Sequence, residues 1–236
     1  MAPARPAPAG EVVPFLGVGM MAGLFALLLV DAAATRAGLV AGLPSLGAMA
    51  GTTAWIASRA AGVTALLALT LDVVFGLLVS TRAADRVLPR ARSVEVHRAL
   101  SVTALTLAAA HAVVLMGDRV VRFDLIDVIV PFASSYRPLA VGLGVLAAWG
   151  LVVLEGSFRV RSRIGARTWR KLHYLSFAVF AGAVAHGVMA GSDAGLLGMR
   201  LFYLAVGGVV AALAGIRVVQ AARAGTGTRQ RQGSRG

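Results

Sequence analysis

Six long apolar stretches, separated by short polar segments, constrain the fold of this chain more than any other feature. A helix needs roughly 20 mostly apolar residues to cross the hydrocarbon core of a bilayer. In lipid only helices and closed barrels satisfy their own backbone hydrogen bonds, and these stretches are too long, and alternate too little, for barrel strands. The sequence therefore predicts an all-α integral membrane protein, a six-transmembrane-helix bundle. The predicted spans are about 12–33, 54–80, 94–116, 137–155, 170–191 and 199–220.

The six spans form one predicted domain, 12–220, between two polar ends. Residues 1–11 are rich in Pro and Ala and residues 221–236 are basic and rich in Gly, so both ends are predicted to be disordered. Small residues after the first span leave open a cleaved signal peptide, although the span is long for one. Residues 117–136 mix apolar side chains with Asp and Arg, which predicts an interfacial segment with a short amphipathic helix.

The charges are distributed unevenly between the two sides of the predicted bundle. With the N-terminus inside, six of the 23 Lys and Arg residues fall outside and the other seventeen inside. The six are Arg36, Arg59, Arg119, Arg122, Arg137 and Arg200. The positive-inside rule then places both termini in the cytoplasm and predicts a multi-pass protein of the plasma membrane, with the lipid bilayer around it. The rule also accounts for the net charge of +13 without a nucleic-acid partner.

All four histidines lie in two of the predicted spans, the third and the fifth. These two helices run in the same direction, so their histidines pair by depth. His97 and His173 follow basic cytoplasmic loops and form the inner pair, while His111 and His186 form the outer pair. Spacings of 14 and 13 residues correspond to about 21 and 20 Å of helix rise.

This arrangement predicts two b-type haems between the third and fifth helices. Two neutral imidazoles from facing helices can occupy both axial positions of a haem iron, which favours electron transfer over ligand activation. The chain has no cysteine, which excludes iron–sulfur clusters and covalently attached haem. Haem propionates need cationic partners at the membrane edge. The candidates are Arg98 and Arg170, with Lys171 and Tyr174, on the inner side, and Arg119, Arg122 or Arg137 on the outer side. A bare metal ion or a proton relay is the other interpretation of the histidines.

The spacing in the fifth helix does not match that in the third. Fourteen residues make nearly four turns, so His97 and His111 share a face, whereas 13 residues leave His186 about 140° away from His173 on an ideal helix. Either the fifth helix is distorted, with Gly182 as a candidate position, or the two haems approach it from different sides. The spacing leaves both possibilities open.

Asp72, inside the second span, is a further candidate. An intramembrane carboxylate can relay a proton or orient an arginine that binds a propionate, or it can simply snorkel toward the membrane surface or pair with a neighbouring helix.

The paired spacings resemble those of the ferric reductase-like transmembrane domain. This domain is shared by ferric reductases, NADPH oxidases and the membrane haem subunit of bacterial methionine sulfoxide reductase systems. The segment Trp169–Ser176, WRKLHYLS, resembles the W-R-x-L-H pattern at the start of the family's second haem helix. The likeness covers roughly residues 55–220 and implies six helices, two stacked b haems and electron flow from inside to outside.

The sequence thus predicts a membrane cytochrome b that takes electrons from a cytoplasmic flavoprotein reductase or a quinol. The acceptor is expected on the extracytoplasmic side. No Gly-rich phosphate loop follows a strand in these residues, so we expect an electron-transfer subunit of a ferric reductase-like system without its own flavin or NADPH domain. A non-redox transporter that uses its histidines for metal or protons is the alternative, and a membrane partner without cofactor is a third hypothesis.

Overall fold

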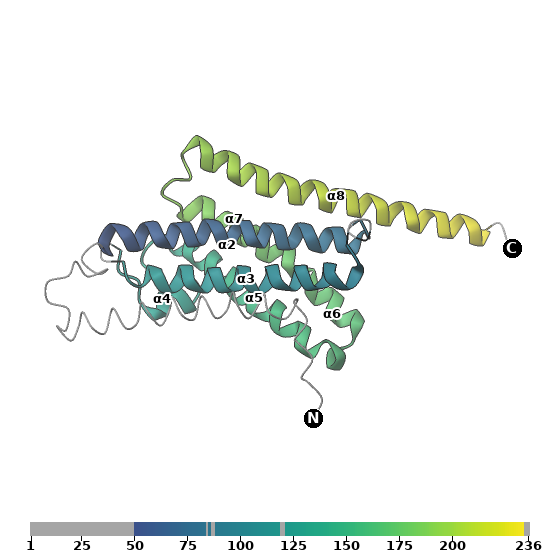
Figure 1. The fold of residues 1–236 in the computed structure, drawn as a ribbon, viewed down its shortest axis with the longest axis horizontal. Helices are drawn as coiled ribbons and strands as arrows, with labels where there is room; N and C mark the ends of the chain where they lie inside the picture. Colours follow the sequence, from purple (N-terminus) through teal and green to yellow (C-terminus); the bar gives the residue numbers. More distant parts are fainter. Residues whose placement is uncertain (1–49, 84, 86–87, 119–120, 234–236) are drawn as a thin grey trace, which may run out of the picture.

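The computed structural model describes residues 50–83, 85, 88–118 and 121–233 (Figure 1). Within these residues the chain is helical and shows no strand. Its helices are α2 (Ala50–Ser80), α3 (Arg90–Leu115), α4 (Leu125–Ile129), α5 (Pro138–Ile164), α6 (Ala166–His173), α7 (Leu175–Ala190) and α8 (Leu197–Gly233). The predicted lead 1–11 and first span 12–33, together with the signal-peptide alternative, lie outside the described residues.

Within the described part of the chain, five segments are long and apolar enough to cross a membrane. They are Trp55–Ser80, Arg90–Leu115, Pro138–Ile164, Ala166–Ala190 and Leu197–Arg223. They confirm five of the six predicted spans and the all-helical class. Helix α8 ends at Gly233, so the backbone is helical in part of the tail 221–236 that the sequence predicts to be disordered.

The long helices form two antiparallel hairpins that pack against each other. Helix α2 lies along α3, α5 lies along α7, and the hairpins meet through α2 with α7 and α3 with α5. Helix α8 crosses over α2 and α7 and extends beyond the bundle (Figure 1). The α2–α3 and α5–α6 turns lie at one end of the bundle (Figure 1). We call it the basic end, because Arg82, Arg90, Arg92, Arg161 and Arg163 lie in or beside these turns.

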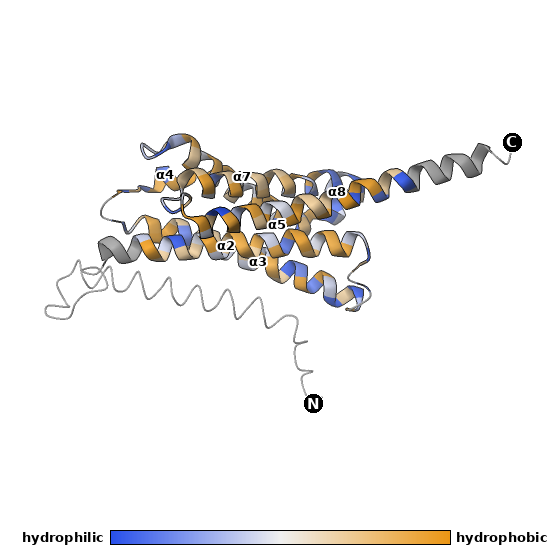
Figure 2. Cartoon of the chain, turned by 90° about the horizontal axis from the view of Figure 1, so that it is seen from above, coloured by the Kyte–Doolittle hydropathy of each residue, from blue (hydrophilic) through white to orange (hydrophobic). Residues whose placement is uncertain are grey.

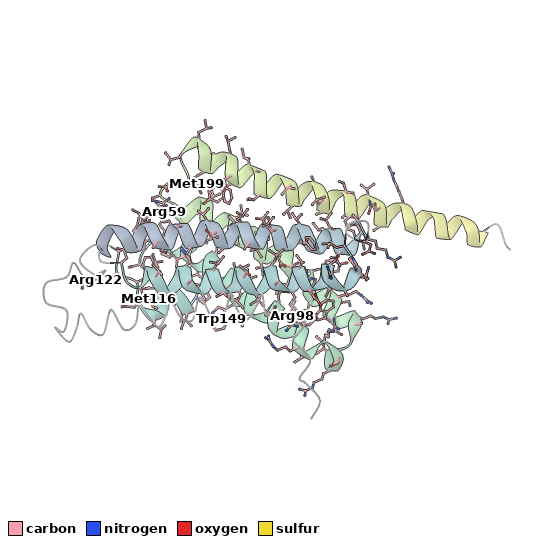
Figure 3. The ribbon with its side chains drawn as sticks, viewed as in Figure 1. Arg59, Arg98, Met116, Arg122, Trp149 and Met199 are labelled. Carbon is pink, nitrogen blue, oxygen red and sulfur yellow. The ribbon has the colours of Figure 1, made fainter. Side chains whose placement is uncertain are left out.

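Hydrophobic residues run along the length of the bundle, and hydrophilic residues lie mainly toward its ends (Figure 2). Many large apolar side chains point outward, for example Leu71 at 47% and Leu204 at 71% exposure. In water such a surface would favour association, but in a bilayer it faces lipid tails that are equally apolar. Figure 3 shows Arg59 and Arg122 toward one end of the bundle and Arg98 toward the other.

The buried core lies between the two histidine levels. It is formed by residues of all the long helices: Leu66, Leu69, Val73, Ala104, Ala147, Leu151, Val179, Phe180, Val206 and Val210. Ala104 is fully buried and lies seven residues from both His97 and His111. The small alanine side chain allows close approach of the helices at mid-depth.

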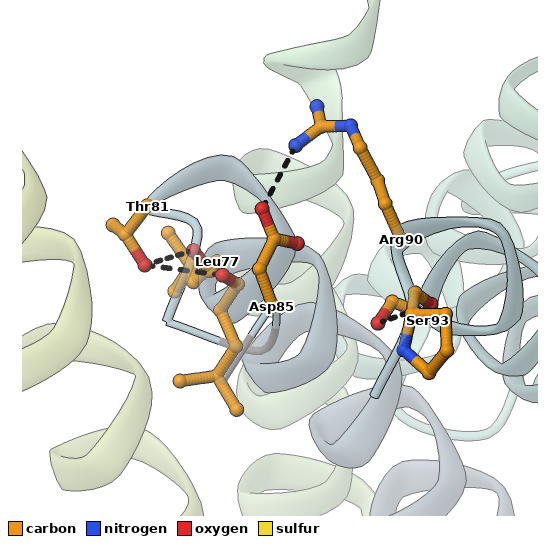
Figure 4. A network of polar contacts seen from close by, with 7 residues as sticks. Leu77, Thr81, Asp85, Arg90 and Ser93 are labelled. Atoms are coloured by element: carbon orange, nitrogen blue, oxygen red, sulfur yellow. Dashed lines mark hydrogen bonds and ion pairs between the residues drawn. The ribbon is translucent and has the colours of Figure 1, made fainter. Parts of the chain in front are cut away.

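The turn between α2 and α3 closes the first hairpin at the basic end (Figure 4). The Thr81 hydroxyl donates to the Leu77 carbonyl at 3.0 Å and so satisfies one of the carbonyls left free where α2 ends. Arg90 forms an ion pair with Asp85 at 3.5 Å across the turn. The turn is thus fixed by local bonds, which sets the register of α3 against α2.

A short helix, α4, follows α3, as the mixed composition of residues 117–136 predicts. The Asp127 carboxylate accepts from the Asp124 backbone N–H at 2.7 Å and caps its first turn. Leu125 and Ile126 are 61% and 65% exposed. An apolar exposed face on a short capped helix fits a position at the membrane surface.

The predicted fifth helix is broken directly after His173. Tyr174 separates α6 from α7, and its N–H bonds to the Lys171 carbonyl at 3.2 Å, while the Phe177 N–H bonds to the Tyr174 carbonyl at 3.2 Å. Hydrogen bonds between residues three apart are those of a 3₁₀ turn, in which the chain rotates by about 120° per residue, compared with 100° in an α-helix. The distortion therefore lies at Tyr174. The position proposed from sequence, Gly182, is wrong, because α7 passes through it as regular helix.

Candidate functional site

Two pairs of histidine rings face each other at two levels of the bundle. The ring centroids of His97 and His173 are 6.1 Å apart, and those of His111 and His186 are also 6.1 Å apart. An iron–nitrogen bond of about 2 Å, and about 1.2 Å from that nitrogen to the ring centre, put two axial imidazoles about 6.4 Å apart. Each pair thus has the separation that two imidazoles on opposite sides of one metal require. The structure thus places His97 beside His173 and His111 beside His186, which is the pairing by depth.

In the outer pair, each ring has its Nδ1 nitrogen fixed by the backbone of a neighbouring helix. His111 Nδ1 lies 2.6 Å from the Ser58 carbonyl of α2 and 3.0 Å from the Ser58 hydroxyl. His186 Nδ1 lies 2.8 Å from the Ala140 carbonyl of α5. A carbonyl can only accept, so Nδ1 carries the hydrogen in both rings and Nε2 keeps a free lone pair. This is the usual state of a metal-ligating histidine.

A glycine makes room for each of these rings. A Cβ at Gly62 would come within 3.0 Å of His111 Nδ1, and one at Gly144 within 2.5 Å of His186 Nδ1. Each glycine follows its carbonyl residue, Ser58 or Ala140, by four positions and so lies on the same helix face. The carbonyl and the glycine together form a cradle, in which one residue accepts the ring hydrogen and the next turn lets the ring approach.

The inner ring of His97 lies in a third cradle, formed by Asp72 and Gly76 of α2. His97 Nδ1 is 3.1 Å from the Asp72 carbonyl and 2.8 Å from the Asp72 carboxylate oxygen Oδ1. A Cβ at Gly76 would come within 3.0 Å of His97 Cε1. Asp72 therefore pairs with a histidine on the neighbouring helix. Of the sequence-based interpretations of Asp72, pairing with a neighbouring helix is the one that the contacts match.

These glycines are not predicted by the histidine spacings alone, although the sequence of α2 contains a matching pattern. The two α2 cradles, Ser58 with Gly62 and Asp72 with Gly76, are 14 residues apart, the same spacing as His97 and His111 on α3. Because α2 and α3 are antiparallel neighbours, the equal spacing brings one α2 cradle beside each α3 histidine. A search for the same 14-residue spacing in adjacent helices could have identified both cradles.

His173 is held differently from the other three histidines. Its ring stacks on the Trp169 indole of α6, with centroids 4.9 Å apart and planes at 21°. Trp169 Nε1 is buried and finds no hydrogen-bond partner in the part of the chain that the structure describes. A buried donor of this kind usually has a partner, and a haem propionate is an acceptor that fits it.

A largely apolar cavity surrounds the outer pair. Its empty volume is about 1400 Å³, including the open space at its mouth, and it is bounded by α2, α3, α5, α7 and α8. Small residues make up much of its wall, among them Ala104, Ala108, Ala148, Ala183 and Gly187. Its few polar atoms come from groups that include His111, His186, Ser58 and Arg59. A flat apolar ring system with a polar edge matches this lining.

The predicted cationic partners that the structure describes are exposed, and the contacts of Arg98 and Arg137 are with groups other than the histidine rings. Arg98 is exposed and stacks over the Phe158 ring at 5.4 Å, and Arg170 is exposed on α6, three residues before His173. Arg137 donates to the Met189 carbonyl at 2.6 Å, and Arg122 is exposed. Arg119 lies outside the described residues. Exposed cationic side chains of this length can still reach the edge of a bound group.

The arginine that lines the outer cavity is Arg59, which the sequence analysis did not assign to the site. It contacts the Asp193 carboxylate and the Ser192 hydroxyl of the α7–α8 loop. Arg59 directly follows Ser58 and precedes Gly62 by three residues, and this position could have predicted that it lies beside the outer pair.

The sequence also matches a known family. The family model "Ferric reductase like transmembrane component" matches residues 61–184, more than half of the chain. The chain belongs to the ferric reductase-like transmembrane family. The matched region contains His97, His111 and His173, and His186 follows two residues after it. The resemblance inferred from the histidine spacings is thereby confirmed.

Membership of this family agrees with the geometry of the site. Ferric reductase-like transmembrane proteins generally bind haem, and the family suggests an electron-transfer role in a membrane. Comparison with curated proteins and with solved structures gave no match. Among the described residues, no three His, Asp or Glu side chains cluster as ligands for a bare metal ion. A pair of histidines fits an iron whose other four ligands come from a macrocycle.

Proposed function

We propose that this protein is a dihaem b-type cytochrome that carries electrons across a membrane. The observation that carries the proposal is the presence of two facing imidazole pairs, each with centroids 6.1 Å apart. His97 and His173 would hold one haem b, and His111 and His186 the other. A haem held by two histidines would supply one-electron transfer rather than ligand activation.

The chain's own residues orient the ligands and exclude water. The carbonyls of Ser58, Asp72 and Ala140 hold the Nδ1 hydrogens of three rings, so their Nε2 atoms are available without rearrangement. The largely apolar wall of the outer cavity disfavours water around the outer pair, which favours small reorganisation when charge moves there. Arg59, Arg98, Arg170 and the Trp169 N–H are the candidates to bind haem propionates.

The two levels are far enough apart to span most of the bilayer. Fourteen residues of α3 rise about 21 Å, compared with about 30 Å for the hydrocarbon core. Ala104 and Phe180, at 0% and 5% exposure, lie between the levels. Ala104 also lines the outer cavity, so this cavity reaches toward the middle of the space between the two sites.

The direction that we propose is from the basic end, on the cytoplasmic side, to an extracytoplasmic acceptor. Seventeen of 23 Lys and Arg residues fall on the side that carries the termini, which supports a plasma-membrane protein with cytoplasmic ends. The donor would be a flavoprotein reductase or a quinol. A reporter that is active only outside the cytoplasm, fused after residue 236, should give no signal. A strong signal would reverse the assignment of the inner and outer pairs.

The decisive experiment is an absorption spectrum of the purified full chain from haem-replete cells. We expect a reducible low-spin b-type spectrum and about two haems per chain by pyridine haemochrome assay, one for each histidine pair. A colourless preparation without haem would overturn the proposal and favour a transporter that uses its histidines for metal or protons.

A further inference from the structure

The two pairs differ in the charge placed beside their ligands. At the inner level, the Asp72 carboxylate lies 2.8 Å from His97 Nδ1, and Asp72 is 7% exposed. At the outer level, the equivalent position on α2 is Ser58, a neutral residue 1% exposed, whose hydroxyl lies 3.0 Å from His111 Nδ1. His186 faces only the neutral carbonyl of Ala140 through its Nδ1 atom.

A buried carboxylate beside a ligand affects the metal in two ways. Its negative charge acts across a medium of low dielectric constant and stabilises the more positive, oxidised iron. It also polarises the Nδ1–H bond of the ring, whose hydrogen the Asp72 backbone carbonyl accepts, and so raises the basicity of the ligating nitrogen and again favours the oxidised iron. Both effects lower the reduction potential of a haem held by that ligand. A neutral hydroxyl produces only a small fraction of either effect.

We infer that Asp72 sets the haem held by His97 and His173 at a lower reduction potential than the haem held by His111 and His186. Asp72 acts through His97 and is therefore a positioning and tuning residue. Its charge makes electron transfer from the inner level to the outer level downhill. This inference rests on the proposed function, because it requires both haems.

The orienting role of Asp72 can be separated from the effect of its charge. Its backbone carbonyl accepts from His97 Nδ1 at 3.1 Å whatever the side chain is. Asp72→Asn therefore removes the charge and leaves the carbonyl, Gly76 and nearly the same side-chain volume. A purely structural carboxylate would change haem retention on substitution, whereas a tuning carboxylate changes the potential of one haem.

The test is a redox titration of the purified full chain, followed by its optical spectrum. In Asp72→Asn, the ratio of reduced to oxidised inner haem at a fixed potential should rise at least tenfold, about 59 mV for a one-electron couple. The outer component should stay in place. Ser58→Ala is the matched control, since it removes a polar side chain at the equivalent position of the same helix. It should shift the outer component by much less than tenfold.

A reciprocal variant covers the case in which Asp72→Asn fails to retain haem. Ser58→Asp introduces a carboxylate beside His111 and should lower the potential of the outer component. The inference is overturned if Asp72→Asn leaves the inner component unchanged, if Ser58→Asp does not lower the outer one, or if the wild-type inner haem has the higher potential. A wild-type protein without haem would instead contradict the proposed function itself.

Discussion

The inner and outer histidine pairs have the same ring separation but are built from different contacts. Both outer rings lie in backbone cradles, with a carbonyl on Nδ1 and a glycine against the ring. In the inner pair only His97 has a cradle, and it contains a carboxylate. His173 instead stacks on Trp169, within a helix of eight residues that ends at His173. The outer site is therefore fixed by the backbone of two long helices, whereas the inner site combines one backbone cradle with a carboxylate and with an indole stacked beside a helix break.

This difference follows from the unequal spacings of the histidines. On α3, 14 residues return to the same face, so two cradles on the adjacent α2 serve both of its histidines. The 13-residue spacing in the other helix would leave one histidine facing away. The turn at Tyr174 changes the rotation, so that His173 and His186 both face α3. The extra rotation between His173 and His186 is introduced at Tyr174, directly beside the inner site, and this is why the inner site is asymmetric.

Removing single histidines should have the largest effect and should separate the two pairs. His111→Ala and His186→Ala should each remove the same haem and lower the content from about two haems per chain to about one. His97→Ala and His173→Ala should each remove the other haem, because a bis-histidine site needs both axial ligands. Haem assay and redox titration of the four purified variants check this. The pairing is wrong if His97→Ala and His186→Ala erase the same component.

A methyl group in the outer cradle should have the next largest effect. Gly144→Ala places a Cβ 2.5 Å from His186 Nδ1, and overpacking of this kind costs about 1–3 kcal/mol. We expect the outer haem to be lost first on heating in detergent, measured by its absorption, while the inner haem is retained. Gly156→Ala on the same helix is the matched control, because a Cβ there has no atom within 4 Å. Equal haem loss in both variants would contradict the cradle.

Replacing Trp169 tests whether stacking substitutes for a cradle at the inner level. Trp169→Ala removes an aromatic pair worth about 0.5–1.5 kcal/mol and should weaken retention of the inner haem about two- to tenfold. Trp169→Phe keeps an aromatic ring against His173 and should retain the haem more firmly than the alanine variant. Dilution into apomyoglobin, with haem transfer followed by absorbance, measures the retention. If the outer haem is released faster instead, Trp169 does not belong to the inner site.

Much of this architecture could be predicted from hydrophobic patterning and from the positions of four histidines. The spans depend on the length of apolar runs, which the bilayer thickness fixes, so five of them agree with the structure. The pairing by depth depends only on helix rise and direction. The break at Tyr174 could not be located from the sequence, because rotation along a helix depends on local hydrogen bonds. The presence of a glycine, such as Gly182, does not show where those bonds change. Gly62, Gly76, Gly144 and Arg59 were missed because each acts through a contact between helices.

The smallest effect is expected at Glu155, a second carboxylate toward the basic end. Its Oε1 lies 3.5 Å from Arg159 and its Oε2 accepts from the Ser101 hydroxyl at 3.4 Å. In contrast to Asp72, Glu155 has a cation, Arg159, beside it that offsets part of its charge, although its own side chain is only 12% exposed. In Glu155→Gln, the reduced-to-oxidised ratio of the inner haem at a fixed potential should rise by no more than about threefold. The outer haem should be unchanged. Redox titration of Glu155→Gln and Asp72→Asn under the same conditions shows which variant shifts the inner potential more. If Glu155→Gln produced the larger shift, net charge at the basic end would set the inner potential, and contact with His97 would not.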